Sequence, residues 1–459
     1  MKMKSLFACL FGTLLVGCAA GPDHIPPSPP SMGTAFLGAT PDMVAGTEPE
    51  TAWWRLYDDP VLEALVARAL EANTDLRVAM ANLKAADAVL AEARDSRMPQ
   101  TQIEGRAAYG RNQPPIALPG DRFTYGGGLQ LSYEADMFGR VSRVVEAAEA
   151  DAAAMAFAQA AVQVKVVAAV TEAYLSICTL SQATDVANAA IALTSDSARI
   201  IRQQQEAGGA AILDVERAEG LAAQARAGLA PLEGALVAAQ FELSALLGQP
   251  PAGMPEQAVH CRVAPQPRHA IGIGDRAGLL RRRPDIAEAE RRLAGSTARV
   301  GVAMADLYPR INIAANISQM GGEGIGNSQG FAYGLGPLLS FSFPNMEAAR
   351  VRIRQAEAQA EAALAAFDGV VLTALKEAEQ ALNGYKTAHM YRREIAEAER
   401  RAERAYYLAE ERYRAGDLAF IDVLVAQSAL IELSLARVDA DRGVAIARVD
   451  VFRALGNAG

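Results

Sequence analysis

Two kinds of hydrophobic pattern alternate along this chain of 459 residues. In long Ala-rich runs the apolar residues recur at helical spacing, whereas in four shorter segments they occupy every second position, as in strands. In the first of these segments Ile103, Ala107 and Tyr109 alternate with polar residues. The predicted strands span 101–113, 122–136, 310–319 and 331–343. The pattern therefore predicts two pairs of strands set between long helices.

The same order of elements occurs twice. A helical run ends at a proline, two strands follow and helix resumes, and each event recurs 210 residues later. The matched positions are Asp75 with Asp285, Pro99 with Pro309, and Arg140 with Arg350. A repeat of this size indicates one duplicated unit rather than several independent domains. We expect a first repeat over 59–250, a linker over 251–270 and a second repeat over 271–459.

Two runs without proline, Arg140 to Glu206 and about Glu347 to Arg414, predict unusually long helices. At about 1.5 Å per residue, the first would reach roughly 100 Å. Helices of this length, with small residues at close spacing, are typical of a coiled-coil-like bundle in an aqueous space. Gly208 and Gly416 follow these helices and can take the left-handed cap that turns the chain back. The candidate tip residues are Gly208, Gly209, Gly416, Asp417 and Leu418.

A shorter helix is predicted to begin at Pro60. Asp59 precedes it as the N-cap, and proline is favoured at the first helical position. Its apolar face is predicted to consist of Leu62, Leu65, Val66 and Ala69.

The predicted strands are as long as a membrane crossing requires, since a tilted strand spans a bilayer in about 9 to 11 residues. Aromatic residues lie toward their ends, as in the girdles of membrane barrels. Four strands cannot close such a barrel, and the interior of an eight-stranded barrel is filled by side chains. A trimer would give twelve strands and a duct, whose expected lining is Gln102, Glu104, Arg106, Gln130, Asn312, Asn316 and Ser340. The alternative is the edge of a soluble sandwich with the aromatics in its core.

The amino terminus reads as an export signal. Lysines precede an apolar run and small residues, which predicts a signal peptide over 1–17. Leu15-Val16-Gly17-Cys18 resembles a bacterial lipobox, so Cys18 is the candidate lipidation site; the alternative is an ordinary signal with an incidental Cys. The Pro-rich stretch that follows predicts a tether within 18–58. No later run of about 18 uncharged apolar residues occurs, so no transmembrane helix is expected.

Charge and composition exclude several classes of function. The net charge of −9 and the pI of about 5.2 argue against a nucleic-acid partner. His260, Cys261 and His269 come nearest to metal-ligand spacing but lack a fourth ligand, and no cofactor motif or catalytic constellation is found. Cys178 lies in a helical run far from Cys261, which disfavours a disulfide between them. We therefore expect no enzyme, no metal and no cofactor.

The stretch Leu280-Arg281-Arg282-Arg283-Pro284-Asp285-Ile286, followed by Tyr308-Pro309, resembles the TolC-like family of outer-membrane efflux proteins, in its lipoprotein branch. The resemblance covers nearly the whole mature chain. It implies a mainly α fold with a small transmembrane β portion, in which a homotrimer forms a 12-stranded β-barrel on an α-helical periplasmic tunnel. It also implies an exit duct that is lipid-anchored in the outer membrane of a Gram-negative bacterium. The implied partners are a periplasmic adaptor and an inner-membrane transporter of the RND type.

The resemblance further implies a gate near the second tip, at Ile421, Asp422 and Val425. Asp422 matches the first of two gate aspartates found in some members, and Val425 stands where the second would be. Leu418 and Ser428 replace arginines that bond the gate in some members. The alternative is that Asp422 is a solvated or capping residue after the turn.

Two other functions remain open on the sequence. One is a lipid-tethered periplasmic helical interaction protein without a pore. The other is a general diffusion porin, which the large helical share of the chain disfavours.

Overall fold

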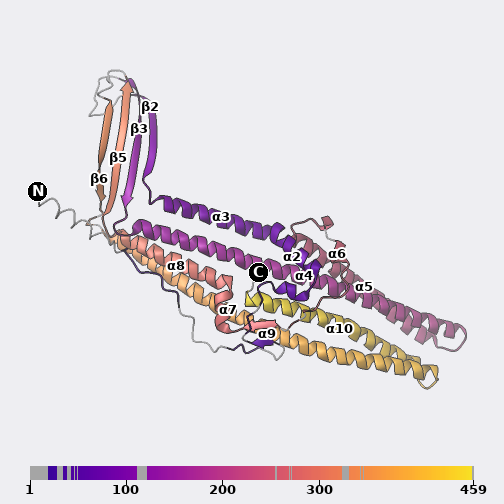
Figure 1. Ribbon diagram of the computed structural model, residues 1–459. Coiled ribbons are helices and arrows are strands. Elements are labelled where there is room, and N and C mark those ends of the chain that lie inside the picture. Colours follow the sequence, from indigo (N-terminus) through magenta and orange to yellow (C-terminus); the bar gives the residue numbers. More distant parts are fainter. Residues whose placement is uncertain are drawn as a thin grey trace. The chain divides into compact units, whose positions relative to one another are not determined.

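The fold was examined in a computed structural model of the chain (Figure 1). The described residues are 19–27, 35–38, 43–45, 47–48, 50–110, 121–253, 256–267, 269, 271–322, 330–341, 343–344 and 346–456. They form two compact units: unit 1 comprises Met1–Pro29, Ala81–Phe157 and Ala287–Val370, and unit 2 comprises Pro30–Met80, Ala158–Ile286 and Val371–Gly459. Each unit takes segments from both predicted repeats, so the units do not coincide with the repeats.

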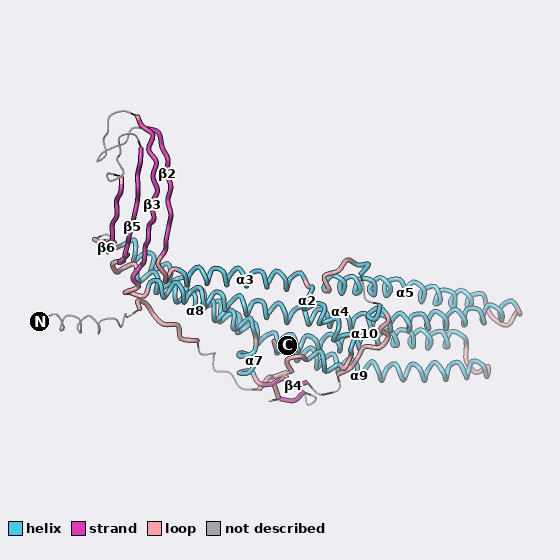
Figure 2. The backbone as a smooth tube through the Cα atoms, turned by 45° about the horizontal axis from the view of Figure 1, so that its top comes forward, coloured by secondary structure: helices cyan, strands magenta, loops and turns pink. Residues whose placement is uncertain are grey.

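Unit 1 contains a four-stranded antiparallel sheet, drawn as one continuous sheet in Figure 2. Its strands are β2 (Gln100–Gly110), β3 (Arg122–Ala135), β5 (Arg310–Gly322) and β6 (Phe331–Ser340), in the order β2-β3-β5-β6. Each repeat supplies one hairpin, and the pairing of β3 with β5 joins the two hairpins. The predicted strand ends at 111–113 lie outside the described residues, and β6 ends before the predicted limit of 343.

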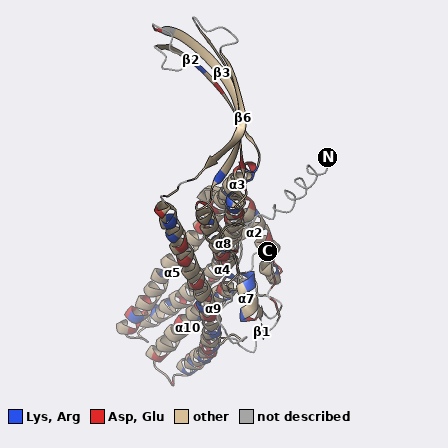
Figure 3. Ribbon diagram, turned by 90° about the vertical axis from the view of Figure 1, so that its left-hand side faces the viewer, with Lys and Arg blue, Asp and Glu red and all other residues tan. Residues whose placement is uncertain are grey.

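The helices of unit 1 follow the sequence pattern closely. They are α8 (Pro284–Ala305), most of α3 (Thr74–Asp95), and the first parts of α4 (Arg140–Glu206) and α9 (Glu347–Arg414), which continue into unit 2. The bounds predicted for the two long helices are confirmed. Arg94 on α3 and Glu149 on α4 form an ion pair of 2.9 Å, and Figure 3 shows that such charges gather on the helices and are sparse on the strands.

Residues 20–24, within the stretch predicted to be a tether, are hydrogen-bonded to other parts of unit 1. The Ala20 N–H donates to the Phe138 carbonyl at 3.0 Å. The Arg143 side chain is only 5% exposed and donates to the Ala20 and Gly21 carbonyls at 3.1 and 3.2 Å and to Asp23 at 2.7 Å. Burial alone would lower the pKa of Arg143, but its hydrogen bonds to Glu146 and Asp23 hold the pKa above the ordinary value. The sequence suggested a tether because prolines follow these residues. The hydrogen bonds could not be predicted, because a backbone carbonyl that accepts from a distant arginine leaves no signal in the sequence.

Unit 2 is built around one large apolar core. Helix α2 (Pro60–Ala72) begins as predicted, with the Asp59 carboxylate accepting from the Val61 N–H at 2.8 Å, and its four predicted apolar residues are buried. The short helix η1 (Trp53–Tyr57) places Trp53 against Phe452, with ring centroids 4.6 Å apart. Two further helices are α5 (Ile212–Leu246) and α10 (Phe420–Leu455), and the parallel pair β1 (Met43–Ala45) and β4 (Ile271–Gly274) completes the core.

The arginine-rich stretch before α8 connects three elements of unit 2. After α7 (Arg276–Arg282), Arg283 binds both carboxylate oxygens of Asp285, at 2.9 and 2.6 Å, and Glu377 on α9 at 2.7 Å. It also donates to the Ala454 carbonyl at 3.0 Å, near the end of α10. Burial lowers the pKa of Arg283, but the paired carboxylates raise it above its ordinary value. This arginine therefore joins the start of α8 to α9 and α10.

The predicted linker 251–270 is packed onto unit 2 in its described part. It contains η2 (Pro251–Gly253) and α6 (Glu256–Val259), and Ala258 and Ala264 are buried in the apolar core. Cys261 forms a disulfide with Cys178 on α4, so the expectation that these residues are unconnected is wrong. They are 83 residues apart in sequence, and only the return of the chain along α5 brings them together.

Among the described residues, three helices are long and apolar enough, by length and composition, to cross a membrane. The most apolar stretches of α4, α5 and α9 reach mean hydropathies of 1.6, 1.2 and 1.3. Ala and Val raise these averages although charged residues interrupt the runs. In α4 the apolar side chains Val166, Val167 and Val170 are buried in the core of unit 2, which accounts for part of this hydropathy.

Loss of the disulfide is expected to destabilise unit 2. A cross-link that closes a loop of this size contributes about 2 to 5 kcal/mol, mainly by restricting the unfolded chain. In thermal unfolding of the purified protein, Cys261→Ser should lower the midpoint, and a reductant should do the same to the parent protein. The double variant C178S/C261S is the control, because a reductant should not shift it further; an unchanged midpoint in Cys261→Ser would contradict the expectation.

Candidate functional site

The predicted tips have the same backbone geometry in both repeats. Gly208 and Gly416 have positive φ values of 75° and 82°, as their predicted capping role requires. The Gly208 N–H donates to the Gln205 carbonyl and the Gly209 N–H to the Gln204 carbonyl, at 2.9 and 2.7 Å, which is the Schellman pattern. The second tip repeats it, with Gly416 N–H on the Tyr413 carbonyl and Asp417 N–H on the Arg412 carbonyl. Asp417 is exposed and Leu418 half-buried.

The predicted gate residues share one face of α10. Asp422 and Val425 are exposed, Val425 by 62%, and Ile421 is half-buried. The opposite face of the helix carries Phe420 and Val423 into an apolar cluster. That cluster also contains Ala198 and Ile201 on α4, Val215, Ala218 and Ala222 on α5, Tyr406 on α9, and Leu424. Unit 2 thus leaves uncovered the face of α10 that carries the gate residues.

Asp422 does not act as the cap of α10 in the part of the chain that is described. The N-cap position belongs to Ala419, and the Asp422 N–H donates to the Ala419 carbonyl at 3.1 Å. As an acid in the first helical turn, Asp422 lies where the positive end of the helix dipole stabilises it. Its position is therefore compatible with either a gate or a solvated role.

Two polar contacts that the sequence did not reveal attach α9 and α10 to α4. The Tyr413 hydroxyl donates to Gln204 Oε1 at 2.6 Å, and the Gln427 amide donates to Ser197 Oγ at 3.0 Å. Gln427 is fully buried, and its Oε1 has no partner among the described residues. Tyr413 precedes the tip glycine by three residues, but nothing in its own surroundings indicated a partner more than 200 positions away. Gln427 lies on α10 between Val425 and Ser428, and Tyr413 lies five residues before Leu418.

The strand register brings the predicted duct-lining residues onto one face of the sheet. Gln102 pairs with Gln130, and Gln130 with Asn316, so these three side chains form a row across β2, β3 and β5. Arg310 pairs with Ser340 in the same alternation, and Glu104, Arg106 and Asn312 occupy that face too. Leu338, opposite Asn312, is the apolar exception on this face.

The other face of the sheet is apolar and exposed. Ile103, Leu129, Ile317 and Tyr333 form one row across the four strands, exposed by 84%, 44%, 53% and 78%. Exposed aromatic residues extend this face toward the strand ends: Tyr109, Phe123, Tyr125 and Phe331. A soluble monomer rarely leaves an apolar surface of this extent uncovered, so the face requires lipid or protein against it.

A comparison with protein families matches two stretches of the chain, 65–249 and 277–457, to the model described as outer membrane efflux protein. The chain belongs to this family. The two matches correspond to the two repeats and leave out the amino-terminal segment and the linker.

Similar proteins extend over nearly the whole chain. Outer membrane protein OprJ of Pseudomonas aeruginosa is 30% identical over 98% of this chain and 95% of its own length. Nodulation protein T of Rhizobium leguminosarum bv. trifolii is 28% identical over 95% of this chain and 94% of its own. The solved structure of the outer-membrane channel OprN superposes with a TM-score of 0.89 at 32% identity, covering 96% of this chain and 99% of that chain.

These findings confirm the predicted family, fold class and function. The chain is an outer-membrane efflux protein, an exit duct of a Gram-negative bacterium that reaches into the periplasm. The interpretations as a pore-free interaction protein or a general porin are wrong. Cys18 and the predicted signal peptide lie outside the described residues.

Removing the two polar contacts to α4 should loosen α9 and α10. Each such hydrogen bond contributes about 0.5 to 1.5 kcal/mol, so Tyr413→Phe with Gln427→Leu is expected to favour a wider opening. Ser197 keeps its bond to the Leu193 carbonyl, so the change is confined to the link between helices. Single-channel conductance in planar bilayers should rise.

The matched control is Tyr407→Phe, because Tyr407 lies on the same helix and is 58% exposed. Equal conductance of the double variant and this control would contradict a role for the two contacts.

Proposed function

We propose that the chain works as a homotrimer, joined in a tripartite system to a periplasmic adaptor and an inner-membrane transporter of the RND type. The observation that carries the trimer is the open sheet. Strands β2 and β6 lie at its edges, each with one side unpaired in the described chain. Within a bilayer such backbone groups must be paired, which only a closed barrel achieves. Three copies of four strands would supply about twelve strands, enough to enclose a duct.

The polar face of the sheet would then line the duct. Gln102, Glu104, Arg106, Gln130, Asn312, Asn316 and Ser340 share this face, and the exposed apolar face would meet lipid. The alternative assignment would place charged residues in hydrocarbon, at a cost of about 2 to 4 kcal/mol for an arginine at the midplane. The charges of Glu104 and Arg106 therefore support an aqueous interior on their side.

The tips and the uncovered face of α10 would form the periplasmic end. In a trimer, three copies of Ile421, Asp422 and Val425 would meet around the axis as the resting constriction. We assign its closed state to the contacts Tyr413–Gln204 and Gln427–Ser197, in place of the charged bonds that Val425, Leu418 and Ser428 cannot make. The capped turns at Gly208, Gly209, Gly416, Asp417 and Leu418 would receive the adaptor. We propose no catalytic role, cofactor or metal for any part of the chain.

A lipid on Cys18 would anchor the amino terminus. The described chain starts one residue later, at Ala19, and the segment after it is bound to unit 1 through Arg143. An anchor joined to so short and well-bound a segment would be held near the beginning of α4 rather than ranging freely.

A ring of Asp422 is expected to control conductance and ion preference. Three carboxylates close together repel one another and favour cations in a narrow path. Asp422→Ala should raise single-channel conductance in planar bilayers and reduce the preference for cations. Asp439→Ala is the control, because Asp439 lies about five helical turns along α10 from Asp422 and pairs with Arg442 at 2.8 Å. Unchanged conductance and selectivity in Asp422→Ala would contradict the proposed ring of carboxylates.

Acylation of Cys18 is tested on the protein extracted from outer membranes. Mass spectrometry of the amino-terminal peptide should show a mature chain that begins at Cys18 and carries lipid. Cys18→Ser should lose the lipid, and Cys178→Ser should keep it. A mature chain that begins elsewhere, without lipid, would refute the assignment.

A further inference from the structure

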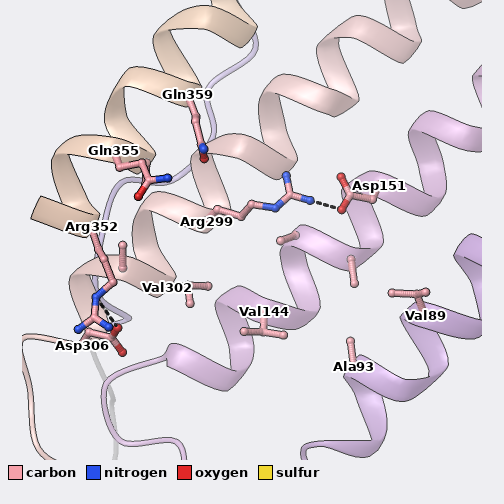
Figure 4. Close-up of a pocket in the computed structure, with 14 residues that line it drawn as sticks. Val89, Ala93, Val144, Asp151, Arg299, Val302, Asp306, Arg352, Gln355 and Gln359 are labelled. Atoms are coloured by element: carbon pink, nitrogen blue, oxygen red, sulfur yellow. Dashed lines mark hydrogen bonds and ion pairs between the residues drawn. The ribbon is translucent and has the colours of Figure 1, made fainter. Parts of the chain in front are cut away.

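Unit 1 contains a pocket of about 490 Å³ lined by residues of its helical part (Figure 4). Its lining comes from α3, α4, α8 and α9, so both repeats contribute two helices. The volume lies within the range of about 300 to 1,000 Å³ that is usual for small-molecule sites.

The floor of the pocket is apolar. It consists of small aliphatic side chains: Val89, Ala93, Val144, Ala147, Ala148, Val302, Ala303 and Ala356. Such a floor suits the apolar body of an organic molecule and offers it no hydrogen bond. The polar lining groups are Asp151, Arg299, Asp306, Arg352, Gln355 and Gln359, and Figure 4 shows Arg352, Gln355 and Gln359 together on α9.

The ion pairs around the pocket leave one guanidinium incompletely paired. Arg299 pairs closely with Asp151 across α8 and α4. Asp306 is 14% exposed and pairs closely with Arg310, four residues later at the start of β5. Arg352 reaches the same carboxylate only at 3.7 Å, and its side chain is 58% exposed. Arg352 is thus the charged group of the lining that retains capacity for another anion.

The charges of the pocket lining balance. Two guanidinium groups, on Arg299 and Arg352, stand against two carboxylates, on Asp151 and Asp306, and Asp306 is also paired with Arg310. Arg352 is therefore the cation whose charge the lining carboxylates compensate least. Gln355 and Gln359 extend from α9 on the same side as Arg352, and their amides can donate hydrogen bonds beside it.

We propose that this pocket binds amphipathic organic carboxylates, with the apolar body on the Ala and Val floor and the carboxylate on Arg352. Guanidinium and carboxylate match in geometry as well as in charge, and flanking amides can complete the hydrogen bonds. The proposal that the pocket binds such molecules depends only on residues of unit 1. As a place where carried molecules pause, it rests on the proposed function.

The test uses the full-length protein in lipid nanodiscs, with 2-naphthoate as the probe and the neutral 2-naphthalenemethanol as its uncharged counterpart. Equilibrium dialysis against empty nanodiscs corrects for partition into lipid. The parent protein should bind 2-naphthoate saturably and more tightly than the alcohol. Arg352→Gln should weaken the naphthoate by about tenfold or more and leave the alcohol nearly unchanged, because only the charge-assisted bond is lost.

Two further variants keep the proposal falsifiable. Ala303→Leu reduces the space and should weaken both probes. Arg354→Gln, on the same helix, removes an arginine that pairs with Glu347 at 3.1 Å outside the pocket lining, and it should bind both probes like the parent. Equal binding of 2-naphthoate by the parent and Arg352→Gln would overturn the proposal, as would the absence of saturable binding at millimolar probe.

Conductance of the same preparations separates this proposal from the proposed function. A conducting protein that does not bind 2-naphthoate refutes the pocket alone. A protein that binds it but forms no channel refutes the duct and retains the binding site.

Discussion

The unpaired edges of the four-stranded sheet are the constraint on which the rest of the structure depends. Backbone donors and acceptors in hydrocarbon must find partners, and a four-stranded sheet leaves two rows of them open. The apolar face shows that the sheet is built for lipid, so copies of the chain must supply the missing pairs. Every helix that continues from a strand is thereby placed around a common axis. The gate, the tips and the duct lining that we propose are then properties of the assembly, and a single chain carries only a share of each.

Buried arginines fix the segments that neither helix nor strand would position. Arg143 holds the amino-terminal residues through two carbonyl oxygens and a carboxylate, and Arg283 holds the end of α10 through the Ala454 carbonyl. In both cases one rigid guanidinium satisfies several acceptors from segments far apart in sequence. Replacing one of these arginines would leave several acceptors without this donor at once. Each arginine therefore contributes more to stability than a single hydrogen bond would.

The sequence predicted the long elements well because their signals are local. The length of α4 and α9 was predicted from the absence of proline and from the glycine that follows each helix. The start of α2 was predicted from Asp59 and Pro60. The alternation along each strand predicted that all seven polar residues share one face. The structure confirms this, because even-numbered residues pair with even-numbered residues in all three strand pairs. The disulfide, the docked amino terminus and the Tyr413–Gln204 contact escaped prediction because each joins residues that only the folded chain brings together. The substitutions at Leu418, Val425 and Ser428 predicted a changed lock, but gave no sign of the contacts that we propose in its place.

The division of the molecule into two units has a consequence for its ancestry. Each unit takes segments from both repeats, and the sheet needs a hairpin from each, so neither repeat has a core of its own. A single-repeat ancestor would therefore have had to share its core with a second copy, and six copies would have been needed for about twelve strands. Fusion of two copies halves the number of subunits that must find one another. It also frees the two halves to diverge, as the different residues at the two tips already show.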